Sequence, residues 1–309
     1  MAVCFVRFRV EAHHHHHHGP ARYDRAFAIG IGLNVAFVIA ELIFGVRAHS
    51  LALTADAGHN LGDVLGLGLA WAATLLGARR PTMRRTYGLR RFSILAALGN
   101  AGFLLIAVGV IAVEAVHRLR EPGPVATTTV IVVALIGICI NLGTALGFMR
   151  GRKEDLNIRG AFLHMLGDAA ASAGVVIAAV AIWWTGWTWI DPVVSLILVA
   201  LIMAGSWGLL RDSLNLALDA VPPGIDTEVV TAYLGSLPGV TDVHDVHIWG
   251  LSTTHVALTA HLVVPEGGNT DSLIATASRQ LHDRFGIEHA TMQIEQRHLA
   301  HECALGGAA

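Results

Sequence analysis

The sequence predicts a membrane protein in two parts, a bundle of six transmembrane helices followed by a small α+β domain. Of its 309 residues 54% are hydrophobic and only 14% are charged, whereas a soluble domain usually carries about 25% charged residues. The mean hydropathy is +0.57. The net charge is −2, so the chain has no overall attraction to nucleic acid, and we expect no nucleic-acid partner.

Residues 1–24 are predicted to form a histidine-rich cytosolic tail outside the fold. Six of the eighteen histidines stand in one run, His13 to His18. Six is the usual length of an affinity tag, yet the run does not follow a short vector leader, so a native metal-collecting tail stays open as the alternative. The segment is no signal peptide, because Arg7 and Arg9 interrupt an apolar stretch that is already too short.

Residues 25–211 are predicted to contain the membrane part, because they hold six apolar stretches that each reach the roughly 20 residues needed to cross a bilayer. Lipid offers no hydrogen-bond partners to the backbone, so every span must be helical. The spans are expected approximately at 26–46, 51–78, 94–116, 125–149, 161–184 and 192–210.

The charges between the spans predict their orientation. The loop after the second span holds six arginines and the loop after the fourth holds three arginines and a lysine, whereas the opposite side carries only Arg47, Arg118 and Arg120. Because positive loops stay in the cytoplasm, both termini are predicted to be cytoplasmic, in a protein of the inner cell membrane.

Residues 212–297 have the composition of a soluble domain, and 298–309 are expected to be a tail. Asp226 can cap a helix that runs to Leu237, two strand-like runs follow at 240–251 and 254–264, a second helix begins near Asp271, and a last strand covers 290–296. This αββαβ order predicts two layers with an antiparallel sheet.

Two predicted spans carry the same pentapeptide, His-x-Leu-Gly-Asp. The pattern places His59 with Asp63 in the second span and His164 with Asp168 in the fifth. An ionisable side chain at the centre of a membrane helix costs roughly 2.5 to 3.5 kcal/mol on insertion scales, so each copy needs a reason to be there. Residues four apart share one helix face, and two facing helices would supply two nitrogen and two oxygen ligands, a set that suits tetrahedral Zn²⁺.

A polar clamp without metal, in which each aspartate accepts a hydrogen bond from its histidine, is the alternative for these pairs. The repetition of the pentapeptide in two separate spans favours the metal site. Other polar residues within the spans can serve as hydrogen-bonding groups between helices or lie on an ion path: Asn34, Glu41, Asp56, Asn100, Glu114, Asn141 and Asp191.

The chain resembles the cation diffusion facilitator family of divalent-metal exporters, from Arg25 to about Gln296. The resemblance rests on HSLALTADAGHNLGDVLGL, on DPVVSL, on LALDAVPPGID and on HDVHIWGLS. It implies a homodimer of six-helix protomers with a cytosolic ferredoxin-like domain that exchanges metal for protons. By motif position, the ligands are His59, Asp63, His164 and Asp168. The paired His-x-x-x-Asp pattern resembles the zinc, cobalt and cadmium efflux branch, and the histidine at position 59 argues against manganese, because manganese-type relatives carry an aspartate there.

The sequence also departs from the family. Many members have an acidic residue shortly after the Tyr-Gly of the second cytosolic loop, where this chain has Ser93. Some relatives bind a further metal in that loop, but 77–91 contains no histidine or aspartate, and we expect no metal site there.

The soluble part offers candidate ligands for a regulatory zinc ion. His244 and His261 stand at positions that resemble the metal-binding histidines of related domains, while His301 and Cys303 could form a soft clasp in the tail. His244 and His247 point to opposite faces of a regular strand, so any metal must recruit ligands from several strands, the tail or a second protomer.

The predicted activity is export of a divalent cation, most simply Zn²⁺ or else Cd²⁺ or Co²⁺, by proton-coupled alternating access without an organic cofactor. A passive channel or a metal-gated sensor stays open as an alternative. An intramembrane zinc protease needs a His-Glu-x-x-His helix, which this sequence lacks, so we expect a transporter and no enzyme.

Overall fold

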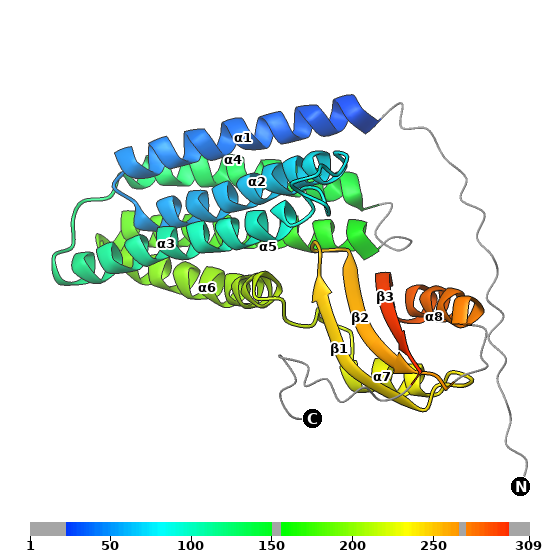
Figure 1. Ribbon diagram of the computed structural model, residues 1–309. Helices are drawn as coiled ribbons and strands as arrows, with labels where there is room; N and C mark the ends of the chain where they lie inside the picture. Colours follow the sequence, from blue (N-terminus) through cyan, green and yellow to red (C-terminus); the bar gives the residue numbers. More distant parts are fainter. Residues whose placement is uncertain (1–22, 150–155, 266–269, 297–309) are drawn as a thin grey trace, which may run out of the picture.

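The computed structural model describes residues 23–149, 156–265 and 270–296 (Figure 1). Predicted elements that lie elsewhere, including the histidine run and the C-terminal tail, fall outside the described residues. The first part of the chain forms long helices. Their bounds are α1 Tyr23–Arg47, α2 Leu51–Gly77, α3 Phe92–Arg120, α4 Thr127–Phe148, α5 Leu156–Thr185 and α6 Ile190–Ala217.

Five helices of the described chain, α2 to α6, are long and apolar enough to cross a membrane. Many of their large apolar side chains are exposed, such as Ile106 at 71% and Ile177 at 70%. A soluble bundle would bury such residues, whereas lipid solvates them. The apolar helices therefore make this chain an integral membrane protein.

Glycines on α2 allow α3 to pack against it closely. A methyl group added at Gly62 would lie 2.2 Å from a Leu104 side-chain carbon, and one added at Gly66 would lie 2.8 Å from the Asn100 amide nitrogen. The GxxxG spacing of these residues thus forms the α2–α3 contact, as expected for small residues in membrane helices. The glycines at 167 and 174 on α5 have no such neighbour among the described residues.

Asp191 fixes the start of α2 against the start of α6. Its carboxylate accepts hydrogen bonds from the Ser50 hydroxyl, from Leu51 N at 2.7 Å and from Ala52 N at 3.3 Å. The first amides of a helix lack intrahelical partners and attract negative charge, so this buried carboxylate has a structural role at the helix N-terminus.

The second part of the chain is a small α+β domain with the predicted order of elements. It contains α7 Thr227–Gly235, β1 Asp242–Gly250, β2 Val256–Val263, α8 Thr270–Phe285 and β3 Ile287–Glu295. Asp226 caps α7 through bonds to Glu228 N and Val229 N, as predicted. The helices bury Leu234 and Leu281 with Leu258 of the sheet in one apolar core.

The predicted antiparallel sheet is wrong in one of its two pairings. The three strands lie in the order β1-β2-β3, with β1 antiparallel to β2 but β2 parallel to β3. The reason is α8, a crossover helix between β2 and β3. Such a crossover returns the chain to the end of the sheet at which β2 began, so β3 must run in the same direction.

Candidate functional site

The two His-x-Leu-Gly-Asp pentapeptides lie on neighbouring helices. His59 and Asp63 are on α2, and His164 and Asp168 are on α5. The two helices contact each other, and the spacing of four residues presents both side chains of each pair on one helix face. The structure thus brings together all four residues that the sequence singled out.

The four side chains form a ring in which nitrogen and oxygen atoms alternate. Nε2 of His59 lies 3.6 Å from Oδ2 of Asp63 and 3.5 Å from Oδ1 of Asp168. Nε2 of His164 lies 3.2 Å from Oδ2 of Asp63 and 3.7 Å from Oδ2 of Asp168. Each imidazole therefore faces both carboxylates, and each carboxylate links the two helices.

The nitrogen–oxygen separations are close to those between the ligands of a small tetrahedral cation. Ligand atoms about 2.0 to 2.1 Å from zinc lie about 3.3 to 3.4 Å apart along the edges of a tetrahedron. The observed separations of 3.2 to 3.7 Å are close to that edge. Ligand atoms of His59, Asp63 and Asp168 all lie within 4.8 Å of one another, and His164 stands outside this group of three. Oδ2 of Asp63 is buried, and the Nε2 atoms of both histidines approach it.

The four residues differ in exposure across the ring. The Asp168 side chain is 6% exposed and lies against the bundle, whereas the His164 side chain is 43% exposed. The His59 side chain is intermediate at 27%. The ring is thus most buried at Asp168 and most exposed at His164.

A second cluster of possible ligands joins all three strands of the α+β domain. It consists of His244 on β1, His261 on β2 and Glu295 on β3. Nε2 of His244 lies 3.5 Å from Oε2 of Glu295, and Nδ1 of His261 lies 3.1 Å from Oε1 of Glu295. The Glu295 side chain is only 6% exposed, so a buried carboxylate holds the two imidazoles together.

Each imidazole of this cluster also approaches an aspartate with its other nitrogen. Nδ1 of His244 lies 3.6 Å from Asp242, and Nε2 of His261 lies 3.6 Å from Asp245. Carboxylates that orient metal-binding histidines from behind are common in protein metal sites. Asp245 reaches this position because β1 has a register irregularity between His244 and His247, where Asp245 has a positive φ of 51°.

Sequence reasoning found His244 and His261 but missed Glu295. His244 is paired with His261 across β1 and β2, and His261 is paired with Gln293 across β2 and β3. Glu295 follows two residues later and shares a face with Gln293. The other two predicted ligands, His301 and Cys303, lie outside the described residues.

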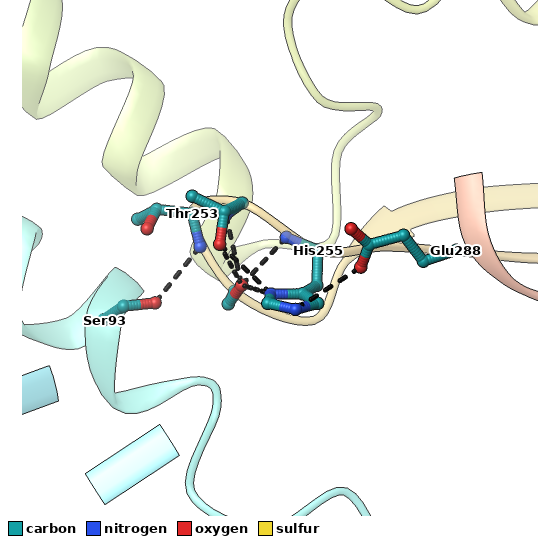
Figure 2. Close-up of polar contacts among 6 residues, drawn as sticks. Ser93, Thr253, His255 and Glu288 are labelled. Carbon is teal, nitrogen blue, oxygen red and sulfur yellow. Dashed lines mark hydrogen bonds and ion pairs between the residues drawn. The ribbon is translucent and has the colours of Figure 1, made fainter. Parts of the chain in front are cut away.

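The α+β domain touches the start of α3, where Thr253 faces Ser93 (Figure 2), and the loop between α2 and α3, where the Tyr87 ring contacts His289. Thr253 N donates a 3.1 Å hydrogen bond to the hydroxyl of Ser93, and Arg91 forms an ion pair with Asp219. Beside these contacts, a pocket of about 380 Å³ is lined in part by Tyr87 from the loop and by His289 from β3. Ser93, the departure from the family pattern, thus joins the two parts of the chain.

His255 is held in this junction by neighbours on both ring nitrogens. Its Nδ1 lies 2.9 Å from the Ser252 hydroxyl and 3.1 Å from the Thr254 hydroxyl, and its Nε2 lies 3.5 Å from Glu288 (Figure 2). These contacts shape the β1–β2 turn that carries Thr253. The turn thus contacts the start of α3 through Thr253.

Two family models match most of the chain. Residues 27–216 match the cation efflux transmembrane domain, and residues 222–297 match the cation efflux protein cytoplasmic domain. Three curated relatives illustrate the similarity. The chain is 37% identical over 278 residues, 89% of itself and 88% of the relative, to the cation efflux system protein CzcD of Alcaligenes sp. (strain CT14).

The other two relatives extend the comparison. The zinc transporter ZitB of Escherichia coli (strain K12) is 37% identical over 88% of this chain and 87% of its own length. The cadmium, cobalt and zinc/H⁺-K⁺ antiporter of Bacillus subtilis (strain 168) is 32% identical over 91% of this chain and 92% of its own length. Together with the family models, these matches confirm the resemblance: the chain belongs to the cation diffusion facilitator, or cation efflux, family of membrane transporters, which are not enzymes.

Proposed function

We propose that this transporter exports Zn²⁺ and binds it between α2 and α5. The observation that carries the proposal is the alternating ring of His59, Asp63, His164 and Asp168, with nitrogen to oxygen separations of 3.2 to 3.7 Å. Two neutral imidazoles and two carboxylates balance the charge of a dication, and this ligand set suits zinc better than harder ions. The names of the zinc transporter and of the cadmium, cobalt and zinc antiporter among the relatives support it.

Protons are the proposed counter-ion. Histidine binds metal only when neutral, and its ordinary pKa near 6.5 lies in the physiological range, so protons and zinc compete for His59 and His164. If the helices expose the ring to each side in turn, protonation at the more acidic outer face helps to release zinc. The Bacillus relative is named as an antiporter of these metals with H⁺ and K⁺, which supports this coupling.

The proposed topology has six spans and two cytoplasmic termini, in the inner cell membrane. Helix α1 is 25 residues long and lies beside α2 and α4. We assign it as a further membrane span, which brings the total of five apolar helices to six. The arginines of the α2–α3 loop favour the cytoplasm. The α+β domain contacts this loop and the adjoining start of α3, for example through the ring contact between Tyr87 and His289, so it belongs on the same side.

The α+β domain is proposed to be ferredoxin-like and to mediate a homodimer. Its αββαβ order supports the fold, and the match to the cytoplasmic domain of cation efflux proteins supports the assembly. The cluster of His244, His261 and Glu295 would bind a regulatory zinc ion there. Binding would join three strands and so stabilise the domain when cytoplasmic zinc is plentiful.

Flux in reconstituted vesicles tests the transport proposal. With an acidic lumen, protons leaving the vesicle should drive zinc inward, and the initial rate should rise at least about fivefold over vesicles without a gradient. Cadmium and cobalt should follow zinc, and manganese should be transported poorly. A rate that does not respond to the gradient would favour the passive channel, and zinc binding without any flux would favour the sensor.

The cytosolic cluster has a separate test in the Asp168→Asn background, where the intramembrane site is disabled. The run His13 to His18 must first be removed, because it binds zinc by itself. Equilibrium dialysis should then find about one high-affinity zinc ion per chain, lost on further replacement of His261 by alanine. Replacing the exposed His282 of α8 with alanine is the control. Unchanged stoichiometry in the His261 variant would exclude this cluster as the site.

A further inference from the structure

Two carboxyl groups are buried in the bundle next to the candidate zinc site but do not belong to it. Glu41 on α1 is 0% exposed, and Asp56 on α2 is 1% exposed. Each accepts one hydrogen bond from a neutral donor: Asn60 Nδ2 donates to Oε2 of Glu41 at 3.0 Å, and Ser172 Oγ donates to Oδ2 of Asp56 at 2.7 Å. Neither forms an ion pair within the described part of the chain. A buried carboxylate without a cation is expensive.

The two carboxyl groups also contact each other. The Glu41 and Asp56 carboxyl groups lie within hydrogen-bonding reach of each other, although carboxylate oxygens can only accept when both groups are ionised. Oε1 of Glu41 is buried and has no donor among the described residues. A single proton resolves both problems, because a protonated Glu41 donates to the Asp56 carboxylate and removes one of two adjacent charges.

We propose that Glu41 and Asp56 together hold one proton, at a proton-binding site that is separate from the four zinc ligands. The proton is carried on Glu41 and shared with Asp56. The pair then has one negative charge, which the Ser172 hydroxyl and the Asn60 amide stabilise by hydrogen bonds. This inference rests on the proposed proton-coupled export and deepens it by adding a proton that zinc does not displace directly.

The surroundings of the pair connect it to the zinc site electrostatically. Helix α4, which packs against α1, contributes no acidic or basic residue from Thr127 to Phe148. Helix α6 contributes Asp191, which is engaged at the start of α2, and Arg211 and Asp212 near its other end. Helix α3 contributes Glu114, which is paired with Arg118, and His117 and Arg120 in its last turn. The charges of His59 and Asp168 therefore act on the pair most directly.

This arrangement predicts that zinc binding at the ring favours release of the shared proton. An ionised Asp168 repels negative charge on the pair and so favours retention of the shared proton. Zinc at the ring would neutralise Asp168 and weaken that hold, so the proton would dissociate to water as H⁺ once water reaches the pair. The zinc site and the carboxyl pair are also connected through helix α5. Ser172 stands four residues after Asp168 on this helix, and its hydroxyl donates a hydrogen bond to Asp56 on α2.

The variant Glu41→Gln tests the proposal, because glutamine keeps the shape and can donate to Asp56 but cannot titrate. Infrared difference spectroscopy of the chain without its histidine run should detect a protonated carboxyl at neutral pH in the parent and lose that band in the variant. The number of protons released per zinc ion bound should fall by about half a proton, and the zinc dissociation constant should rise about two- to threefold, because release of the shared proton strengthens zinc binding in the parent. Glu114→Gln is the matched control and should keep both the band and the proton count.

Two results would overturn the shared proton: a carboxyl band that persists in Glu41→Gln, or equal proton release by variant and parent. If Glu41→Gln does not fold, Ser172→Ala replaces it. Loss of the serine hydroxyl removes a donor to the anionic form, so the carboxyl band should persist to higher pH, and an unchanged titration would count against the pair. A parent protein that binds no zinc would refute the proposed function but not the shared proton, because the infrared band is measured without zinc.

Discussion

Replacing Asp168 with asparagine should abolish zinc transport and weaken zinc binding at the intramembrane site at least about 100-fold, since loss of an outer partner of a metal ligand already weakens binding about 10- to 100-fold. Asp168 is the member of the ring that lies deepest in the bundle, with its side chain 6% exposed. Its two oxygens face different histidines, Oδ1 toward His59 at 3.5 Å and Oδ2 toward His164 at 3.7 Å. Asparagine keeps the volume but removes one of the two charges that balance the dication.

The measurement is zinc titration of the purified chain without its histidine run, together with vesicle flux. Asp212→Asn is the control, because Asp212 is an exposed carboxylate on α6 outside the candidate site. The control should bind and transport like the parent. Wild-type flux in the Asp168 variant would show that zinc does not pass through this ring, and would favour the polar clamp without metal.

The sequence alone could identify these four residues because a lipid environment makes ionisable side chains conspicuous. His59 and His164 stand in apolar stretches, where each needs a partner, and the repeated spacing to Asp63 and Asp168 supplies one on the same helix face. The structure added the alternating order of nitrogen and oxygen around the ring. That order depends on the rotation of α2 relative to α5, which no pattern within one helix specifies.

Glu295 could not be predicted as a candidate metal ligand from the sequence. In a soluble domain a single glutamate near the end of a strand is ordinary, and nothing in its neighbourhood marks it. It reaches His244 and His261 only because β3 pairs with β2 in parallel, whereas the order of elements in the sequence predicts an antiparallel sheet. The length of the helical segment before β3 was the available signal, since a long crossover is typical of parallel pairing.

The carboxyl pair of Glu41 and Asp56 could be predicted only in part. The sequence marks both as polar residues in apolar spans, but it does not tell a hydrogen bond between helices from a shared proton. The distinction needs the donors: Asn60 and Ser172 each satisfy one oxygen, which leaves Oε1 of Glu41 without a donor among the described residues. Which donor reaches which buried oxygen is known only from the three-dimensional structure.

Replacing His59 with aspartate should change the metal preference of the transporter. The ring would then hold one imidazole and three carboxylates, and oxygen-rich sets favour harder ions such as manganese, whereas imidazole favours zinc. We expect the ratio of zinc to manganese initial rates in vesicles to fall at least about tenfold, mainly through a gain for manganese. His59 is the informative position because its Nε2 lies within 3.6 Å of both carboxylates, one on each helix.

The control for this change is His117→Asp, which makes the same substitution at the exposed end of α3, outside the ring. It should leave the ratio of the two rates unchanged. The substitution also separates two explanations of selectivity. If ligand chemistry sets the preference, His59→Asp gains manganese transport while still responding to a pH gradient, because His164 and the proposed Glu41–Asp56 pair still bind protons. If the shape of the helix contact sets it, the variant loses zinc transport and gains nothing, and the zinc preference must then be sought in the packing of α2 against α3 and α5.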